Sequence, residues 1–311
     1  MNYFSRLHWT LLSVMISLLL SACGGGAVDT KPADNTPSTE TGAPLASGDY
    51  ASDGFNWFNF RRKQMGLPLL MRSKVIDAAA QNHSLYQKLN NGISHDEFNG
   101  KPGYTGTGLF NRLNYVGYSF SMQDAYAYGE VIAASTRSSG FSAGEELIAA
   151  IFHRFLIFEP SYKEAGAGAA SSGAYTYFTT DFAANNGLGN GIGKGKLASY
   201  PFANQTQVPT IFYSDEEIPD PVPNQNAVGY PISVHADTTS TVLVRTFSVQ
   251  VRGGLPLAVK VFSSINSSET PHSAAAIIPL TTLTPNTLYD VQFDGSVDGV
   301  PLVLNWSFTT K

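Results

Sequence analysis

The stretch GFSAGEELIAAIFHRFLIFEPSYKEAGAG, residues 140–168, contains the signals for a helix and for the strand that follows it. Ser142 and Glu145 have the spacing of a capping box, in which both side chains satisfy backbone N–H groups at a helix start. Apolar residues then recur at helical spacing, namely Leu147, Ile148, Ile151, Phe152 and Phe155. Pro160 ends this helix. Gly166 and Gly168 then predict a strand whose backbone closely approaches a neighbour.

Composition indicates a folded protein without an affinity for nucleic acid. The chain has 311 residues, enough for two domains, and 14% of them are charged, with a net charge of −5. Nucleic-acid binding needs a concentrated basic patch, and none is present in the sequence. Cys23 is the single cysteine, so the fold must be held by packing without an intrachain disulfide.

The N-terminus has the pattern of an export signal. Arg6 precedes an apolar run, residues 9–20, that is shorter than the ~20 residues of a membrane span. Leu20-Ser-Ala-Cys23-Gly24 follows and matches the bacterial lipobox, which predicts a signal peptide over residues 1–23 and acylation of Cys23. The alternative is an ordinary signal peptide with an unrelated cysteine.

The segment after Cys23 predicts a tether. Residues 24–50 are rich in Gly, Pro, Ser and Thr, have almost no bulky apolar side chains, and are expected to be disordered. We therefore expect an extracytoplasmic protein attached to the membrane of the cell envelope through its N-terminal lipid. Gly24 resembles the residue found in lipoproteins sorted to the outer membrane, which places the protein there if the envelope is Gram-negative.

The opening stretch resembles the "HR…P…G-x-G" block of the CAP superfamily (cysteine-rich secretory, antigen 5 and pathogenesis-related proteins) in its bacterial form. Three further segments stand in the family's order: residues 59–69 (NFRRKQMGLPL), Ser94-His95, and Gly129-Glu130. Residues 175–182 are similar to the family's closing strand. The resemblance implies an α+β domain over residues 51–200, with an antiparallel sheet between helical layers in an α-β-α sandwich.

The resemblance also implies a site. His95, Glu130 and His153 match the family's ligand- or metal-binding residues, and His83 matches a histidine that we interpret as structural, beneath the site. The family's set is completed by a second glutamate, for which only Glu145 and Glu146 are candidates. Both lie closer to the histidine than the family's spacing places that residue. Val131 also departs from the family, which usually has asparagine there and so a polar group beside the site.

Such a set has two interpretations. Imidazoles and carboxylates from separate elements can bind a divalent metal such as zinc or polarise a water molecule, with Glu130 as the catalytic base. Alternatively, they form a buried polar network that contributes only stability. No cofactor is required by the sequence.

Two further motifs have simpler explanations. Residues 140–144 read G-x-S-x-G, as in the nucleophile elbow of α/β-hydrolases, but the preceding residues 136–139 are polar where that elbow needs a buried strand. The capping box accounts for Ser142. Residues 187–196 (GLGNGIGKGK) are rich in glycine without the register of a phosphate-binding loop, and predict a flexible linker.

The last third of the chain predicts an all-β domain over residues 201–311. Short apolar or alternating runs are separated by Gly, Pro, Asn and Asp, and residues 283–310 resemble the end of bacterial Ig-like or fibronectin-III-like domains. Trp306 is then a core residue and Asp298-Gly299 a hairpin turn. His235 and His272 have no acidic or cysteine neighbours at ligand spacing, and are interpreted as surface or strand residues.

Three functions are consistent with these patterns. The leading hypothesis is a non-enzymatic binding module at the envelope, with a small apolar or lipid ligand, an envelope polymer or a divalent ion as partner. The rival is a metal-assisted hydrolase or peptidase that uses His95, Glu130 and His153. The third is a purely structural envelope protein.

Overall fold

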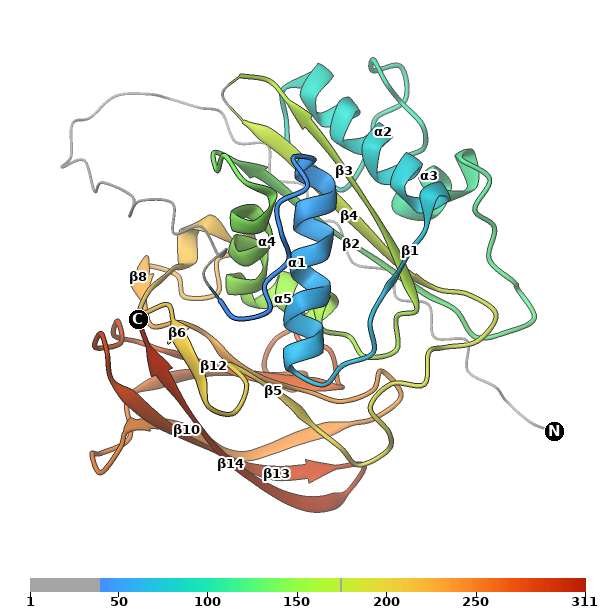
Figure 1. The fold of residues 1–311 in the computed structure, drawn as a ribbon. Helices are drawn as coiled ribbons and strands as arrows, with labels where there is room; N and C mark the ends of the chain where they lie inside the picture. Colours follow the sequence, from blue (N-terminus) through green and yellow to red (C-terminus); the bar gives the residue numbers. More distant parts are fainter. Residues whose placement is uncertain (1–39, 174) are drawn as a thin grey trace. The chain divides into compact units, whose positions relative to one another are not determined.

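The computed structural model describes residues 40–173 and 175–311, which belong to one compact unit (Figure 1). The predicted signal peptide, the acylated Cys23 and most of the predicted tether lie outside the described residues. Within the described part, no helix combines the length and the apolar character needed to cross a membrane.

The first half of the described chain is built on a four-stranded sheet of order β1-β3-β4-β2. These strands are β1 (Met71–Arg72), β3 (Glu164–Ser171), β4 (Thr176–Ala184) and β2 (Ala127–Ser135). β1 runs parallel to β3, and the other pairs are antiparallel.

Helices cover both faces of this sheet (Figure 1). The helices are α1 (Tyr50–Gln64), α2 (Lys74–Asn90), α3 (Leu109–Tyr115), α4 (Gly140–Ala149) and α5 (Ile151–Ile157). On one face, Ser84 of α2 donates a hydrogen bond to Thr179 of β4 at 3.0 Å. On the other face, Phe58 of α1 packs on Phe178 of β4. The α-β-α sandwich predicted from the family resemblance is confirmed.

The predicted helix after residue 140 is interrupted. Its N-cap is Ser139, whose side chain accepts a hydrogen bond from the N–H of Phe141. Ser142 instead lies inside α4 and is buried, so the predicted capping box with Glu145 is wrong. The helix also breaks at Ala150, which has an extended ψ of 117°, and α5 starts at the next residue. The break is stabilised by Glu217, whose carboxylate accepts hydrogen bonds from the first N–H groups of α5.

The predicted close approach at the glycine pair is confirmed. Both glycines lie on β3 beneath α2. A Cβ atom on Gly166 would overlap the backbone of Asp77, and one on Gly168 would overlap the backbone of Gln81. The two glycines therefore set the distance between α2 and the sheet.

The second half is a β-sandwich of two four-stranded sheets, of order β10-β13-β14-β6 and β11-β12-β9-β5. Its strands are β5 (Ala198–Tyr200), β6 (Gln205–Val208), β9 (Ile232–His235), β10 (Val242–Val251), β11 (Val259–Ser263), β12 (Ala274–Pro279), β13 (Leu288–Val297) and β14 (Val300–Thr310). A small ribbon of β7 (Phe212–Tyr213) and β8 (Ala227–Val228), with a 3₁₀-helix η2 (Ser214–Glu216), lies between β6 and β9 in the chain.

Two details of the predicted β-rich region are confirmed. Trp306 is buried and belongs to the main hydrophobic core. Asp298 and Gly299 both adopt positive φ, at 54° and 79°, between the paired strands β13 and β14. Positive φ at both central residues is the requirement of the type I′ hairpin turn that an Asp-Gly pair predicts.

The helical sandwich and the β-sandwich share one core. Arg154 of α5 is fully buried, donates to the carbonyl oxygens of Ile148 and Pro231, and stacks over the rings of Tyr200 and Tyr230 at 4.9 and 5.0 Å.

The glycine-rich connection between the two halves is also anchored. The carboxylate of Asp237 accepts hydrogen bonds from the N–H groups of Ile192 and Gly193 at 2.6 and 2.9 Å. The expectation of a flexible linker is therefore corrected: its glycines allow the backbone to wrap around Asp237. The strands of the β-sandwich begin with β5, slightly before the predicted boundary at residue 201.

Candidate functional site

Glu130 is the centre of a polar network on the α2 and α3 side of the sheet. The Nδ1 atom of His95, in the loop between these helices, lies 2.8 Å from one carboxylate oxygen of Glu130. The guanidinium of Arg112 on α3 donates to the other oxygen and also to the backbone carbonyl of His95. Arg112 thus fixes both the acid and the loop that presents the histidine.

A second buried pair supports this loop. The Nδ1 atom of His83 lies 3.0 Å from Glu97, and its Nε2 atom lies 2.9 Å from the carbonyl oxygen of Ser94. Glu97 also accepts hydrogen bonds from the N–H groups of Thr105 and Gly106. The two ring nitrogens of His83 therefore join α2 to the loop that carries His95.

Asp181 adds a buried acid next to Glu130. The two residues are partners across β2 and β4, and Asp181 is fully buried. Neither of its carboxyl oxygens accepts a hydrogen bond from another described residue. Burial and then the negative charge of Glu130 raise the pKa of Asp181 well above its usual range. Asp181 therefore keeps its proton, and only one of the two facing carboxyls is charged.

Glu130 itself stays ionised. Burial would raise its pKa, but the Arg112 guanidinium, His83 and His95 together hold the pKa of this carboxyl well below its usual range. Only His95 connects this network to solvent: its side chain is 53% exposed, whereas Glu130 is 4% and Arg112 0% exposed. The Nε2 atom of His95 makes no hydrogen bond to any other described residue.

The structure does not bring His153 to this network. A Cβ on Gly129 would meet Leu156 of α5, so α5 lies on the Gly129 face of β2 and Glu130, the next residue, points to the opposite face. The Nδ1 atom of His153 lies instead 3.0 Å from Glu217, a buried residue just after η2. Val131 also points away from Glu130, into the core. The missing asparagine therefore removes no polar group from the His95 side.

Glu145 and Glu146 also lie away from Glu130. Both are on α4, which packs on the α1 side of the sheet with α5. Glu145 accepts hydrogen bonds from Trp57 at 2.6 Å and from Arg61 at 3.1 Å. Glu146 accepts from Arg137. Neither completes a set around His95.

The predicted ligand set is not assembled, because His95 lies with Glu130 and His153 lies with Glu217. No group of three or more His, Cys, Asp or Glu in the described chain is arranged to hold a metal ion. Both oxygens of Glu130 are already engaged, one by His95 and one by a fixed guanidinium, whose charge opposes a second cation at the same carboxylate. Ser142, the candidate of the hydrolase motif, is buried inside α4 and presents no hydroxyl to solvent.

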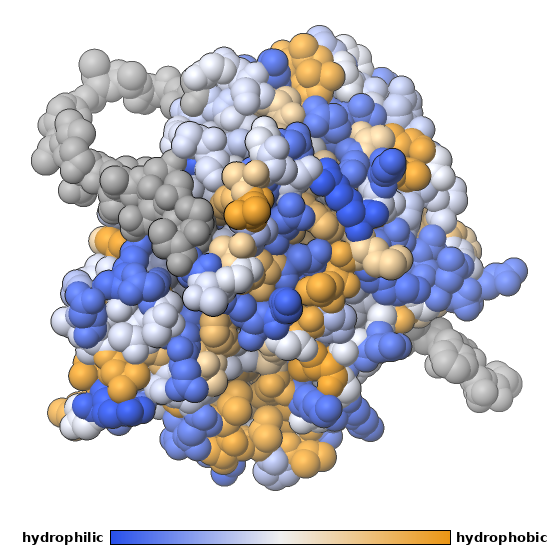
Figure 2. Space-filling model, in the orientation of Figure 1, coloured by the Kyte–Doolittle hydropathy of each residue, from blue (hydrophilic) through white to orange (hydrophobic). Residues whose placement is uncertain are grey.

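Exposed apolar side chains stand close to His95 in the sequence. Leu89 near the end of α2, and Ile93 and Phe98 on either side of His95 in the loop, are 51%, 47% and 48% exposed. Figure 2 shows apolar surface at the top of the molecule, over the C-terminal end of α2. We call these three residues the apolar rim.

Sequence reasoning missed several members of the network. Glu97 and Asp181 lie in polar-looking segments, and Glu217 stands in an acidic run without a spacing signal. Arg112 has no spacing signal that links it to Glu130. Arg112 and Glu130 are 18 residues apart, and His153 and Glu217 are 64 apart, so only the fold shows these pairings.

Comparison with known proteins identifies a family domain in the first half. Residues 55–182 match the family model described as CAP, the cysteine-rich secretory protein family. No curated protein matches the chain.

Among solved structures, the chain is similar to an extracellular protein containing an SCP domain from Bacillus anthracis, at 27% identity and a TM-score of 0.36, covering 45% of this chain and 44% of that one. The chain thus spans less than half of that protein. It is also similar to an outer surface protein from Borrelia burgdorferi, at 15% identity and a TM-score of 0.36. This match covers 42% of this chain and 89% of that protein. A third similar structure is the venom allergen-like protein 4 of Schistosoma mansoni, at 14% identity and a TM-score of 0.29. This match covers 45% of this chain and 90% of that protein.

Proposed function

Residues 55–182 are a CAP domain, and from that premise we propose that the protein is a non-enzymatic binding module of the cell envelope that holds an amphipathic ligand at His95. The ligand is a small lipid-like molecule with a polar group at one end. The predicted lipobox at Cys23 is the basis for placing the protein outside the cytoplasm, on an envelope membrane.

One observation carries this proposal: in the described chain, a half-exposed histidine is the only solvent-exposed side chain of an otherwise buried polar network around Glu130. Glu130 orients the ring of His95 through Nδ1 and leaves Nε2 directed away from the network. An imidazole held in this way offers one well-positioned hydrogen bond to a polar group.

The apolar rim supports the choice of ligand. Leu89, Ile93 and Phe98 leave about half of their side chains in water. Covering such surface with an acyl or ring system contributes about 25 cal/mol per Å². A polar centre beside an apolar border matches a molecule that has both characters.

The state of Glu130 argues against its role as a general base. A catalytic base works best when its pKa lies near the operating pH. The pKa of Glu130 is held well below its usual range, and its oxygens already accept hydrogen bonds from Arg112 and His95. The rival hydrolase would have to use His95 as its base, without a nucleophile identified beside it.

A direct binding measurement tests the proposal. The chain from Asp34 onward, which is one compact unit, would be titrated with dansyl-labelled undecanoic acid followed by fluorescence. His95→Gln removes the ring contact and should weaken binding about fivefold to tenfold, the effect of one hydrogen bond of ~1 to 1.4 kcal/mol. Phe98→Ser should have a similar effect through lost apolar contact.

Leu255→Ser is the matched control, because Leu255 is 86% exposed in the β-rich half. The proposal fails if His95→Gln and Phe98→Ser bind the probe as the wild type and Leu255→Ser do. Zinc content is measured in parallel. Tight zinc binding that His95→Gln abolishes would favour the metal-assisted hydrolase instead.

A further inference from the structure

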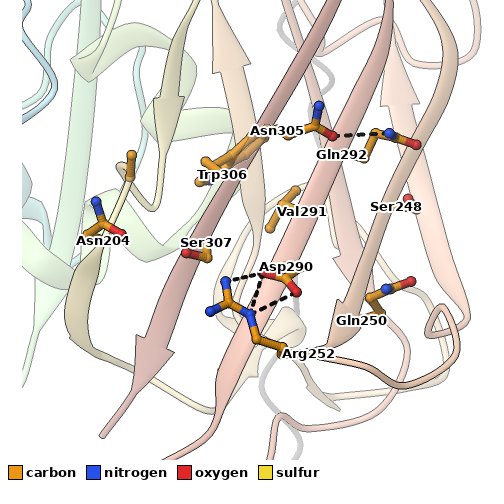
Figure 3. Close-up of a pocket in the computed structure, with 11 residues that line it drawn as sticks. Asn204, Ser248, Gln250, Arg252, Asp290, Val291, Gln292, Asn305, Trp306 and Ser307 are labelled. Atoms are coloured by element: carbon orange, nitrogen blue, oxygen red, sulfur yellow. Dashed lines mark hydrogen bonds and ion pairs between the residues drawn. The ribbon is translucent and has the colours of Figure 1, made fainter.

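The outer face of the β10-β13-β14 sheet contains a hollow of about 560 Å³, far from His95 in the sequence (Figure 3). Most of its lining residues are polar, and they come from β10 and the residue after it, β13, β14 and the turn before β6. The polar residues used below are Asn204, Gln250, Asp290, Gln292, Asn305 and Ser307. The volume lies in the range of small-molecule sites.

Strand alternation builds this lining. Along β13, Tyr289, Val291 and Phe293 are buried in the core, while Asp290 and Gln292 alternate with them and point outward. Val291 and Trp306 also line the hollow, from the core side. The indole N–H of Trp306 donates a hydrogen bond to the carbonyl oxygen of Pro201 at 2.8 Å. The outward-facing side chains of the hollow are therefore polar, and they stand on strands held by long antiparallel ladders.

The polar groups are both donors and acceptors, and several have no partner. The side chains of Asn204, Gln250 and Ser307 make no hydrogen bond to another described residue, although they lie around one hollow (Figure 3). Gln292 donates to Asn305 at 3.0 Å, which leaves N–H groups of both amides for a ligand.

The charges in the hollow cancel. Arg252 binds Asp290 at 2.7 Å, with further contacts at 3.1 and 3.2 Å, as the dashed lines in Figure 3 show. These are the two charged residues in the lining. A nucleic acid or another polyanion needs unpaired cations, and a basic ligand needs unpaired acids, so neither fits this face.

We propose that this hollow, which we call the sandwich hollow, binds a neutral saccharide chain. Each sugar hydroxyl is a donor and an acceptor, as are the amide and hydroxyl side chains of the lining. The planar Arg252–Asp290 pair offers further donors and acceptors without net charge. This site is independent of the ligand site at His95.

The test uses the chain from Asp34 onward and soluble neutral oligosaccharides: hexamers of β-1,4-glucose, α-1,4-glucose and N-acetylglucosamine, titrated by calorimetry. At least one should bind in a saturable way. The double variant Gln292→Ala, Asn305→Ala should weaken that binding by about tenfold or more. Thr246→Ala is the control, because this exposed residue of β10 lies outside the lining and its change should leave affinity unaltered.

The remaining outcomes decide against the proposal. It is overturned if none of the hexamers binds at millimolar concentration, or if the double variant binds as the wild type does while its near-ultraviolet circular dichroism is unchanged. Binding restricted to an acidic polymer such as polygalacturonate, and lost in Arg252→Gln, would also overturn it, because recognition would then depend on charge. His95→Gln should retain saccharide binding, which separates this site from the first.

Discussion

Asp181 and Glu130 face each other across β2 and β4, and Asp181 is the one that keeps its proton. Because the folded-state pKa of Asp181 is raised, the stability that this group contributes is fully present below its unfolded pKa, about 3.9, and is lost as pH rises toward the folded value. Asp181→Asn keeps the shape and a hydrogen-bond donor but cannot ionise.

We therefore expect Asp181→Asn to gain stability over the wild type as pH increases, by up to about 1.4 kcal/mol per pH unit above pH ~4. Urea unfolding of both proteins between pH ~4 and ~9 measures this difference. A difference that stays constant with pH would mean that Asp181 is ionised throughout and that the buried proton does not exist.

Glu145 allows a second comparison at the scale of single residues. Its carboxylate binds Arg61 and Trp57, and it lies within 3.4 Å of the hydroxyls of Tyr200 and Tyr230 from the β-rich half. Glu145→Gln removes one carboxylate partner of Arg61, whose side chain is 5% exposed. We expect a loss of about 3 kcal/mol of unfolding free energy.

Glu146 is the matched control for this change. Its ion pair with Arg137 is more exposed, at 26% and 21%, so Glu146→Gln should cost below about 1 kcal/mol. Thermal or urea denaturation of the two variants checks both values. Equal losses of unfolding free energy in the two variants would show that the contacts of Glu145 with the β-rich half do not add to stability.

At the scale of elements, the contact between β3 and α2 depends on the absence of side chains. Gly168→Ala would force α2 away from the sheet, because a Cβ there overlaps helix backbone that has no room to rotate aside. We expect a destabilisation of about 3 kcal/mol, measured by chemical denaturation. Gly92→Ala, at a position with room for a Cβ, should change stability by less than about 0.5 kcal/mol. If both variants unfold at the same denaturant concentration, this contact does not set the distance between α2 and the sheet.

The same elements show how far sequence reasoning reaches. The Asp-Gly hairpin could be predicted because it depends on neighbours within a few residues. The family resemblance predicted the layers, and the glycine pair predicted a close backbone approach without naming the partner helix. The break at Ala150 could not be predicted, because the residue that stabilises it, Glu217, lies 66 residues beyond Ile151. Likewise, His95 and Glu130 meet, but the alternation of β2 places His153 on the other face of the sheet. Sequence spacing alone carries no information about which face a distant helix covers.

At the scale of the whole molecule, the proposed function depends on attachment at Cys23. Cys23→Ala should move the protein from the membrane fraction to the soluble fraction, because it removes the residue that the proposed lipid is attached to. Fractionation with an envelope-protein control checks this, and mass spectrometry of the mature N-terminus should show the acyl groups on the wild type only. A variant that stays with the membrane would contradict the lipid anchor.

The contact between Glu217 and the start of α5 has a consequence for the order of events during synthesis. The ribosome completes α5 well before it adds the carboxylate that satisfies the first N–H groups of that helix. Tyr230, which shields Arg154, is added later still, and the N–H of Lys311 pairs with Val208. The nascent helical half therefore stays incomplete until the β-rich half has been made.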